Sequence, residues 1–413
     1  MKLHYQNVFW KVFQSGLGFA LIVIQSQFIF GNELATLAIA QAMLVVVSLF
    51  DFGSGVRFTT LLVETFNAYP YSQESRKAIG QYFLSSRKLE IYRIGLIQSL
   101  VFGIPFLFLN FNLTSTLDLG ICLLFSLTVF FHSVGNNFGK LYIATGKINL
   151  LVKLQSIGAI IGFCGGVIGL KTNFNIQMSI LALSFSSIFI GFVSMLGTRR
   201  TSEQDKIYVK KFVANSLKDR TNKWELNLQL SQFFQFLHPL IVQHFVIVNF
   251  QSTGVVAYLI GQRLFGAIGN ALSSETQLNY TYNQDSNRYT IDDVMRFKRH
   301  LLGYILLSLF TVLALTNLWS VIFPSIPSLS PIDLLSFIPL GLCIFADQAA
   351  KIRLYVLKLF FREMFTNLTY LISLCFFLLV FPASSPFILN SLLVISYIFK
   401  LYATTNIWEK FGK

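Results

Sequence analysis

The chain has 413 residues, of which 54% are hydrophobic and 12% are charged. This composition excludes an ordinary soluble domain, because a core of that size could not bury so much apolar surface. The formal net charge of +14 would suit nucleic acid. In so apolar a chain we interpret this positive charge instead as a marker of membrane topology, carried by basic residues that face anionic lipid headgroups. We therefore expect membrane lipids, and no nucleic acid, among the partners.

Twelve apolar stretches follow one another along the chain. Each is long enough to cross a hydrocarbon core of about 30 Å as a helix of about 20 residues. They lie at residues 10–30, 34–56, 91–109, 117–137, 152–170, 176–196, 226–249, 254–276, 301–323, 332–350, 364–382 and 386–405. The sequence therefore predicts an all-α integral membrane protein with 12 transmembrane helices.

The basic residues alternate between the gaps that separate these stretches. Of the 32 Lys and Arg residues, 29 lie near the termini or in the gaps after every second stretch, whereas the other gaps hold only Lys171. Cytoplasmic loops carry an excess of basic residues. We therefore predict that both termini are cytoplasmic and that the protein is a multi-pass membrane protein.

The second half of the chain repeats the plan of the first. Its six stretches begin about 210–220 residues after their counterparts, and a long cytoplasmic gap follows both the second and the eighth stretch. An even number of spans in each half gives parallel repeats. We predict an N-lobe at 1–197 with spans one to six, a cytoplasmic linker at 198–225, and a C-lobe at 226–413 with spans seven to twelve and a short tail.

Several classes of function are disfavoured. The outer loops are no longer than about ten residues, which argues against a membrane enzyme that carries its catalytic groups there. The four cysteines lie far apart in predicted spans and the five histidines form no HExxH, so we expect no disulfide and no metal site. The phosphate-binding motif GxxxxGK[ST] is missing as well. We predict a transporter rather than an enzyme, with no cofactor apart from a driving proton or sodium gradient.

Polar side chains inside predicted spans form stripes on spans one, two, seven and eight. Their members include Gln25, Gln41, Gln232 and Asn270, one from each of these spans. Polar groups are costly in a bilayer, so they normally face protein or a water-filled cavity. Because the stripes fall on matched spans of the two halves, we predict a polar cavity between the lobes. The alternative is that these side chains only join neighbouring helices.

Two arginines stand apart from the topological pattern. Arg263 lies well inside span eight on its polar face, and a guanidinium there needs an anionic partner, such as a phosphate bound in bidentate fashion. The alternative is a structural ion pair. Arg57 lies near the cytoplasmic end of span two and can either face the cavity or extend to the interface. Asp51 is a candidate for ion coupling or for pairing with an arginine. Asp347, four residues before Lys351, is expected to form a local ion pair.

Two short motifs and the topology resemble a known family. Residues 49–55 read Leu-Phe-Asp-Phe-Gly-Ser-Gly at the end of span two, and residues 253–258 read Thr-Gly-Val-Val-Ala-Tyr at the start of span eight. Together with the 6+6 arrangement, they resemble the multidrug/oligosaccharidyl-lipid/polysaccharide (MOP) superfamily. Within it, the chain is most similar to the Wzx-type flippases of O-antigen and other polysaccharides. The resemblance implies a V-shaped, MATE-like pair of lobes with alternating access.

The resemblance also implies a cargo, namely an undecaprenyl-pyrophosphate-linked oligosaccharide such as an O-antigen or capsule repeat unit. A polysaccharide polymerase and a chain-length regulator are the protein partners that such a role suggests. The related lipid II flippases line their cavity with arginines on spans one, two and eight. Arg57 and Arg263 match the last two positions, but span one has only Lys11 at its mouth. This departure argues against lipid II itself as the cargo.

Three other functions stay open from the sequence. A drug/cation antiporter of the same fold would need an acidic cavity, and span one carries no carboxylate. A major-facilitator transporter of sugars or drugs would have a short loop after span two. An integral-membrane polysaccharide polymerase would carry larger outer loops.

Overall fold

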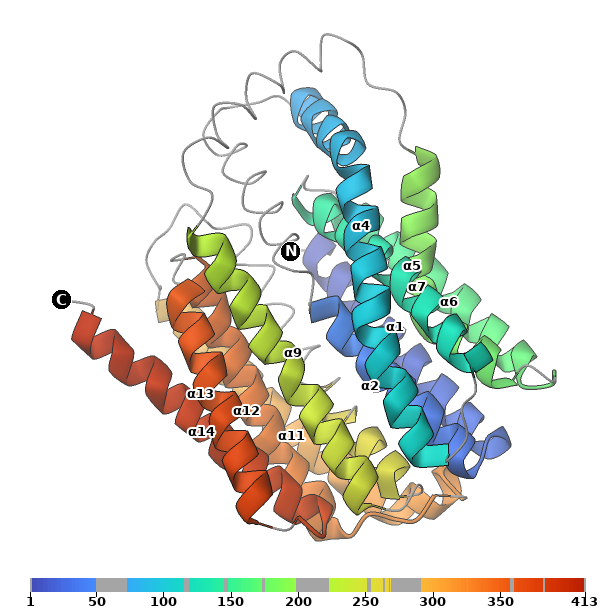
Figure 1. Cartoon of the computed structure of the whole chain (residues 1–413), viewed down its shortest axis with the longest axis vertical. Helices are drawn as coiled ribbons and strands as arrows, with labels where there is room; N and C mark the ends of the chain where they lie inside the picture. The colour runs from blue at the N-terminus through green and yellow to red at the C-terminus, as the bar shows by residue number, and fades with distance from the viewer. Residues whose placement is uncertain are drawn as a thin grey trace. The chain divides into compact units, whose positions relative to one another are not determined.

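The protein is described here by a computed structural model (Figure 1). The description covers residues 2–49, 73–114, 119–144, 148–172, 175–197, 223–250, 254–262, 264–266, 268, 291–324, 326–356, 360–381 and 383–411. The helices in this part are α1 (Lys2–Phe28), α2 (Gly31–Leu49), α4 (Gln73–Thr114), α5 (Leu119–Ala144), α6 (Ile148–Gly169), α7 (Asn175–Gly197), α9 (Lys223–Asn249), α11 (Ile291–Ile322), α12 (Pro331–Val356), α13 (Phe360–Val380) and α14 (Pro386–Phe411). Residues 254–262 are helical as well.

The predicted fold class is confirmed. As far as they are described, the twelve predicted spans coincide with helices; the second, 34–56, and the eighth, 254–276, are described only in their first parts. Within the described residues, six helices are long and apolar enough to cross a membrane. The apolar halves of α7, which meet at an angle of 61°, make a seventh if they are counted as one span.

The chain divides into two compact units. Unit 1 contains Met1–Leu21 and Ala40–Gln232, and unit 2 contains Ile22–Ile39 and Phe233–Lys413. The turn between α1 and α2 belongs to unit 2, and it contains Gly31 at a φ of 58°. This backbone conformation is strained for residues with a side chain, so the glycine permits the two helices to join through a short turn.

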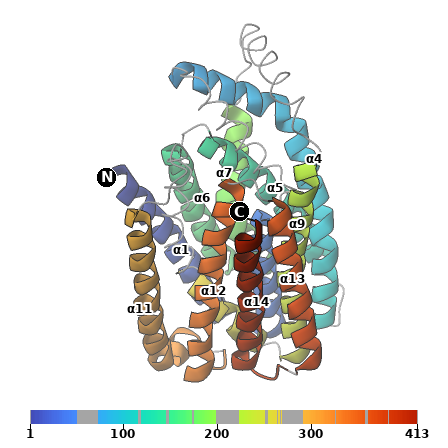
Figure 2. The ribbon, with the colours of Figure 1, turned by 90° about the vertical axis from the view of Figure 1, so that its left-hand side faces the viewer.

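The two units pack their corresponding helices in the same order. In unit 1, α4 packs on α5, α5 on α7 and α7 on α6; in unit 2, α11 packs on α12, α12 on α14 and α14 on α13. Figure 2 shows the second set as a row of neighbouring helices. The helix starts give the register, since α12 begins 212 residues after α5, α13 212 after α6 and α14 211 after α7. The repeat seen in the sequence is therefore also a repeat of packing.

Glycine lets the helices of unit 1 approach closely. A Cβ atom at Gly135 of α5 would lie 1.7 Å from the backbone oxygen of Ser187 in α7, and one at Gly162 of α6 would lie 2.7 Å from that of Ala182. Helices in a bilayer gain little from the hydrophobic effect, so close packing over small residues is a main source of their association. The backbone contact between α5 and α7 therefore depends on Gly135.

Many large apolar side chains remain on the outside of the helices. The apolar stretch Leu301–Ile322 of α11 has a mean hydropathy of 2.1 and is only 22% buried in the protein. Leu306, Phe310 and Leu313 on this helix are all more than half exposed. Lipid tails are a suitable environment for such a surface, and water is not.

Hydrogen bonds fix one end of unit 2. The side chain of Ser330 accepts a hydrogen bond from the backbone N–H of Asp333 at 3.1 Å, which caps the start of α12. The Asp333 carboxylate accepts a hydrogen bond from the backbone N–H of Phe387 at 2.9 Å, which joins the starts of α12 and α14. Nearby, the buried Tyr258 hydroxyl donates to Asn390 at 3.0 Å, and the Asn390 amide donates to Ser336 at 2.7 Å.

Candidate functional site

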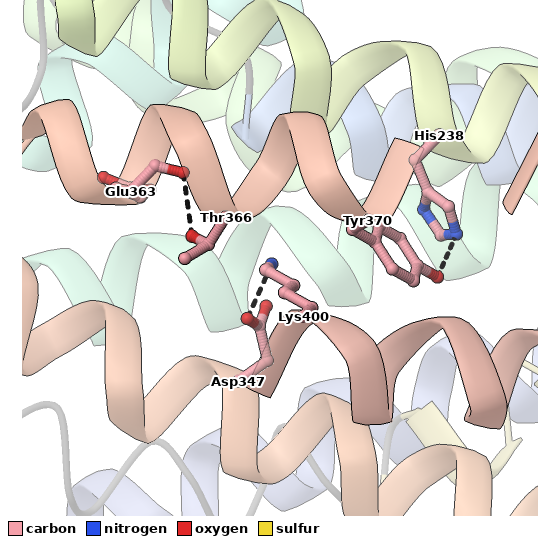
Figure 3. A network of polar contacts seen from close by, with 6 residues as sticks. All are labelled: His238, Asp347, Glu363, Thr366, Tyr370 and Lys400. Atoms are coloured by element: carbon pink, nitrogen blue, oxygen red, sulfur yellow. Dashed lines mark hydrogen bonds and ion pairs between the residues drawn. The ribbon is translucent and has the colours of Figure 1, made fainter. Parts of the chain in front are cut away.

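A buried ion pair joins α12 and α14 in unit 2. The Lys400 ammonium lies 2.6 Å from the Asp347 carboxylate, and the two residues are only 4% and 6% exposed. Figure 3 shows the pair between the two helices. An ionised side chain inside a membrane protein is costly unless a partner compensates it. Each charge therefore makes the burial of the other tolerable.

Two tyrosine rings lie beside this pair. The rings of Tyr370 on α13 and Tyr397 on α14 have centroids 4.4 Å apart. The Lys400 ammonium is 5.6 Å from the centroid of Tyr370 and 5.9 Å from that of Tyr397. A cation this close to an aromatic face is attracted by the quadrupole of the ring. Lys400 is thus held by one carboxylate and two aromatic rings.

A histidine from α9 completes the network. His238 Nε2 lies 2.5 Å from the Tyr370 hydroxyl, so the two groups share a short hydrogen bond. The imidazole centroid is 4.4 Å from the Tyr370 ring and 6.1 Å from the Tyr397 ring. His238 is partly exposed, whereas Tyr370, Tyr397, Asp347 and Lys400 are buried. The imidazole is therefore the member of this set that is open to its surroundings.

Further buried polar groups lie on α13 nearer the start of that helix. Glu363, Thr366 and Asn367 are at most 2% exposed, and the Thr366 hydroxyl donates to the backbone oxygen of Glu363 at 2.9 Å (Figure 3). Glu363 and Tyr370 are seven residues apart, which is about 10 Å along the helix axis. We call His238, Tyr370, Tyr397, Lys400 and Asp347 the polar network of unit 2.

The sequence did not predict this arrangement. The partner that the structure describes for Asp347 is Lys400, which the sequence did not predict; the Lys351 side chain lies outside the described residues, so the expected pair with Lys351 stays a prediction. Lys400 was counted among the basic residues of the cytoplasmic terminus, but it is buried within the apolar stretch Pro386–Ala403. A lysine within the last turn of an apolar stretch was the signal that could have identified it.

The predicted cavity residues are only partly described. Arg57, Asp51, Arg263 and Asn270 lie outside the described residues. Gln41 and Gln232 are buried in unit 1, and Gln25 is buried in unit 2. The Gln25 side chain is 0% exposed, and its amide has no hydrogen-bond partner in the part of the chain that is described. The joint cavity of these residues stays a prediction.

One polar residue of the predicted stripes has a structural contact instead. The Gln14 amide on α1 donates to the Ser156 hydroxyl at 2.8 Å and to the Val152 backbone oxygen at 3.3 Å. Both acceptors belong to α6 in the same unit. For Gln14 the structure thus favours the alternative reading, in which an amide joins neighbouring helices.

Comparisons with known proteins identify the fold that this chain shares. No family model matches the chain and no curated protein matches it. Solved structures do match over nearly their whole length. A mutant of the Vibrio cholerae MATE transporter VcmN is 14% identical with a TM-score of 0.62, covering 99% of this chain and 97% of that one. The lipid II flippase MurJ is 13% identical with a TM-score of 0.59, covering 98% and 87%.

A transporter of the MOP superfamily from Pyrococcus furiosus also matches, with 14% identity and a TM-score of 0.56 over 98% of this chain and 95% of that one. Identities this low establish the fold and leave the substrate open. The chain has the all-helical membrane fold that MATE transporters and MurJ share within the MOP superfamily.

Proposed function

We propose that the protein is a flippase that moves an undecaprenyl-pyrophosphate-linked oligosaccharide from the cytoplasmic to the periplasmic leaflet of the bacterial inner membrane by alternating access. The observation that carries the proposal is the fold, which extends over 98% of the chain and 87% of a lipid II flippase. A flippase of this kind needs no catalytic group. The lipid tail stays in the bilayer while the sugar–pyrophosphate head passes between the lobes.

Residues predicted from the sequence supply the chemistry for such a head group. Arg263, with Arg57, would neutralise the pyrophosphate, because a guanidinium matches phosphate oxygens in a bidentate geometry. Gln25, Gln41, Gln232 and Asn270 would meet sugar hydroxyls. Of the described members, the fully buried Gln25 amide has no partner in the described part of the chain, so its hydrogen-bonding groups must be satisfied by something outside that part.

The matches to MATE transporters favour one alternative, an exporter of drugs or other small molecules with the same fold. The test that separates the two is deletion of the gene in the native host. For the flippase we expect loss of the surface glycan, with single lipid-linked repeat units trapped on the cytoplasmic leaflet. A normal surface glycan and no trapped intermediate would contradict the flippase and would direct the work to drug efflux.

The pyrophosphate site has its own test in the complemented deletion strain. Arg263→Ala should abolish glycan transport at normal protein levels, because the pyrophosphate then loses its cation inside span eight and only Arg57, near the cytoplasmic end of span two, remains. Arg263→Lys should retain part of the activity, since it keeps the charge but loses the bidentate geometry. Transport at the wild-type rate by Arg263→Ala would remove Arg263 from the site.

A further inference from the structure

Span eight packs on α12 through one of its faces. The ring of the buried Tyr258 has its centroid 5.5 Å from that of Phe337 on α12, and the Phe265 ring is stacked on Phe337 at 5.6 Å. Between them, a Cβ atom at Gly261 would lie 2.7 Å from the Phe337 ring. Positions 258, 261 and 265 fall within about 60° of one another around an ideal helix. We call these three residues the packing face of span eight.

Hydrogen bonds hold the packing face in place. The Tyr258 hydroxyl donates to Asn390 on α14 at 3.0 Å, and the Asn390 amide donates to Ser336 on α12 at 2.7 Å. All three residues are buried, and breaking a buried hydrogen bond leaves its partners unsatisfied. These contacts therefore fix the rotation of the helix about its own axis, and with it the direction of every other face of this helix within unit 2.

A second face of the same helix is open. Gln262 and Gly266 are four residues apart, so they lie one above the other on the helix. Residues 255–261 are all buried, but Gln262 and Gly266 are not. Gln262 is eight residues, or about 12 Å, beyond the start of span eight at residue 254. A polar side chain this deep in a membrane normally faces protein or a water-filled cavity.

The open face differs from a face that meets lipid tails. On α11 the exposed residues in the middle of the span include Leu306, Phe310 and Leu313. Span eight has an amide and a glycine at its two open positions. An amide that is placed against hydrocarbon loses its hydrogen bonds. The open face therefore suits a polar ligand better than a lipid tail.

The two glycines of this part of the helix have different explanations. Gly261 is required by packing, because the Phe337 ring takes the space of a side chain. At Gly266, nothing in the described part of the chain lies within 4 Å of the Cβ position. Glycine is less favourable than alanine inside a helix, and the packing of unit 2 gives no reason for it here. Glycine also occurs where a backbone must come close to a ligand, and that use fits Gly266.

We propose that Gln262 and Gly266 form the subsite for the first sugar of the cargo, the ring that is bonded to the pyrophosphate. The inference deepens the proposed function and rests on it. Arg263, the proposed pyrophosphate ligand, follows Gln262 directly in the sequence, and the first sugar follows the pyrophosphate directly in the cargo. Gly266 gives the ring room beside the helix, and the Gln262 amide binds the hydroxyl or acetamido groups of the ring.

The chemistry of the two residues makes this subsite selective. An amide offers both donors and an acceptor, so it matches a sugar hydroxyl, which also donates and accepts. It carries no charge and therefore does not compete with the pyrophosphate for a cation. A site that hydrogen-bonds a hydroxyl rejects an analogue without it more strongly than an apolar pocket rejects an extra methylene. Gln262 therefore recognises the substituents of the ring, and the space at Gly266 limits its size.

The first test compares two probes that differ only in the sugar, undecaprenyl pyrophosphate and undecaprenyl-pyrophosphoryl-N-acetylglucosamine. Kd is measured for each probe with the purified full-length protein in lipid nanodiscs. Gly266→Leu fills the space beside the helix, so Kd for the sugar-bearing probe should rise by about 10-fold or more, with little change for undecaprenyl pyrophosphate. Gly303→Leu on α11 is the matched control, since its Cβ position is also open, and it should alter neither Kd.

The second test uses the same probes to examine Gln262. Gln262→Leu removes the amide at similar volume, so Kd for the sugar-bearing probe should rise by roughly 2-fold to 10-fold, the value of one hydrogen bond. Gln262→Asn keeps an amide and should recover part of this loss. The control is Asn317→Leu, which removes an exposed amide of α11 that donates to the Leu313 backbone oxygen at 2.8 Å. A wild-type Kd for the sugar-bearing probe in Gln262→Leu would overturn the proposal.

The outcomes separate this inference from the flippase proposal. Wild-type protein that binds neither probe would contradict both. If wild-type protein binds both probes, an unchanged affinity in Gly266→Leu, or an equal partial loss for the two probes, would contradict the sugar subsite alone. If Gly266→Leu binds neither probe, Gly266→Ala decides, because it adds a single methyl group. A loss confined to the sugar-bearing probe in that variant supports the subsite, and any other result overturns it.

Discussion

In unit 1, α5 and α7 come together because Gly135 has no side chain, whereas in unit 2 the corresponding helices α12 and α14 are joined by Asp347 and Lys400. The packing order is the same in both units. The difference shows that one fold tolerates two kinds of helix contact: close backbone packing, and a buried ion pair surrounded by tyrosines. Because the described α5–α7 contact is made at a glycine, packing of this helix pair does not by itself require the buried charges found between α12 and α14.

The largest effect is expected from breaking the ion pair on one side. Lys400→Met leaves the Asp347 carboxylate buried without its cation, which should lower the free energy of unfolding by about 3–5 kcal/mol. The double variant with Asp347→Asn should regain most of this loss. Unfolding of the purified protein in micelles measures both values. The control is Lys153→Met, at an exposed lysine of α6, which should change the free energy of unfolding by no more than about 0.5 kcal/mol. An equal loss in the double and single variants would contradict this view of the pair.

A smaller effect is expected from filling the glycine contact of unit 1. Gly135→Ala places a Cβ atom 1.7 Å from the Ser187 backbone oxygen, so α5 and α7 must move apart. We expect a loss of about 1–3 kcal/mol in the unfolding free energy. Gly165→Ala is the control, since nothing lies within 4 Å of its Cβ position and alanine favours a helix by up to about 1 kcal/mol. Similar results for the two variants would show that the close approach is unimportant.

The smallest effect concerns single hydrogen bonds, one in each unit. Gln14→Leu removes the 2.8 Å bond from α1 to Ser156, and Tyr258→Phe removes the 3.0 Å bond to Asn390. Each variant should lose about 0.6 kcal/mol, the average for hydrogen bonds between transmembrane helices. The same unfolding assay measures them. A loss several times larger in Tyr258→Phe alone would mean that the polar contacts of unit 2 are also structural, which would weaken the contrast between the units.

Much of the fold was predictable from the sequence. Apolar stretches of sufficient length must become helices in a bilayer, because no water is present to satisfy the backbone. The spacing of about 210–220 residues between halves predicted a repeat, and the packing order of the helices repeats accordingly. The topological rule of alternating charge also explains why Lys400 was misread. It counts basic residues near helix ends without regard to which of them are buried.

The candidate site was less accessible to prediction. Helical spacing can place Asp347 and Lys351 on one face, but it says nothing about a lysine 53 residues further along the chain, at position 400. The contact depends on how α12 lies against α14. His238 posed the same difficulty, since its partner Tyr370 lies on another helix, 132 residues away.

The sequence by itself determined the all-helical fold class, the approximate limits of the described helices and the twofold plan, because hydrophobicity and charge act locally along a chain in a membrane. Only the tertiary structure decided which polar residues meet. It placed Gln14 against α6, Lys400 against Asp347 and His238 against Tyr370. The physical reason is that a buried polar group must find a partner wherever the packing provides one, and packing between helices depends on the shapes of many side chains at once.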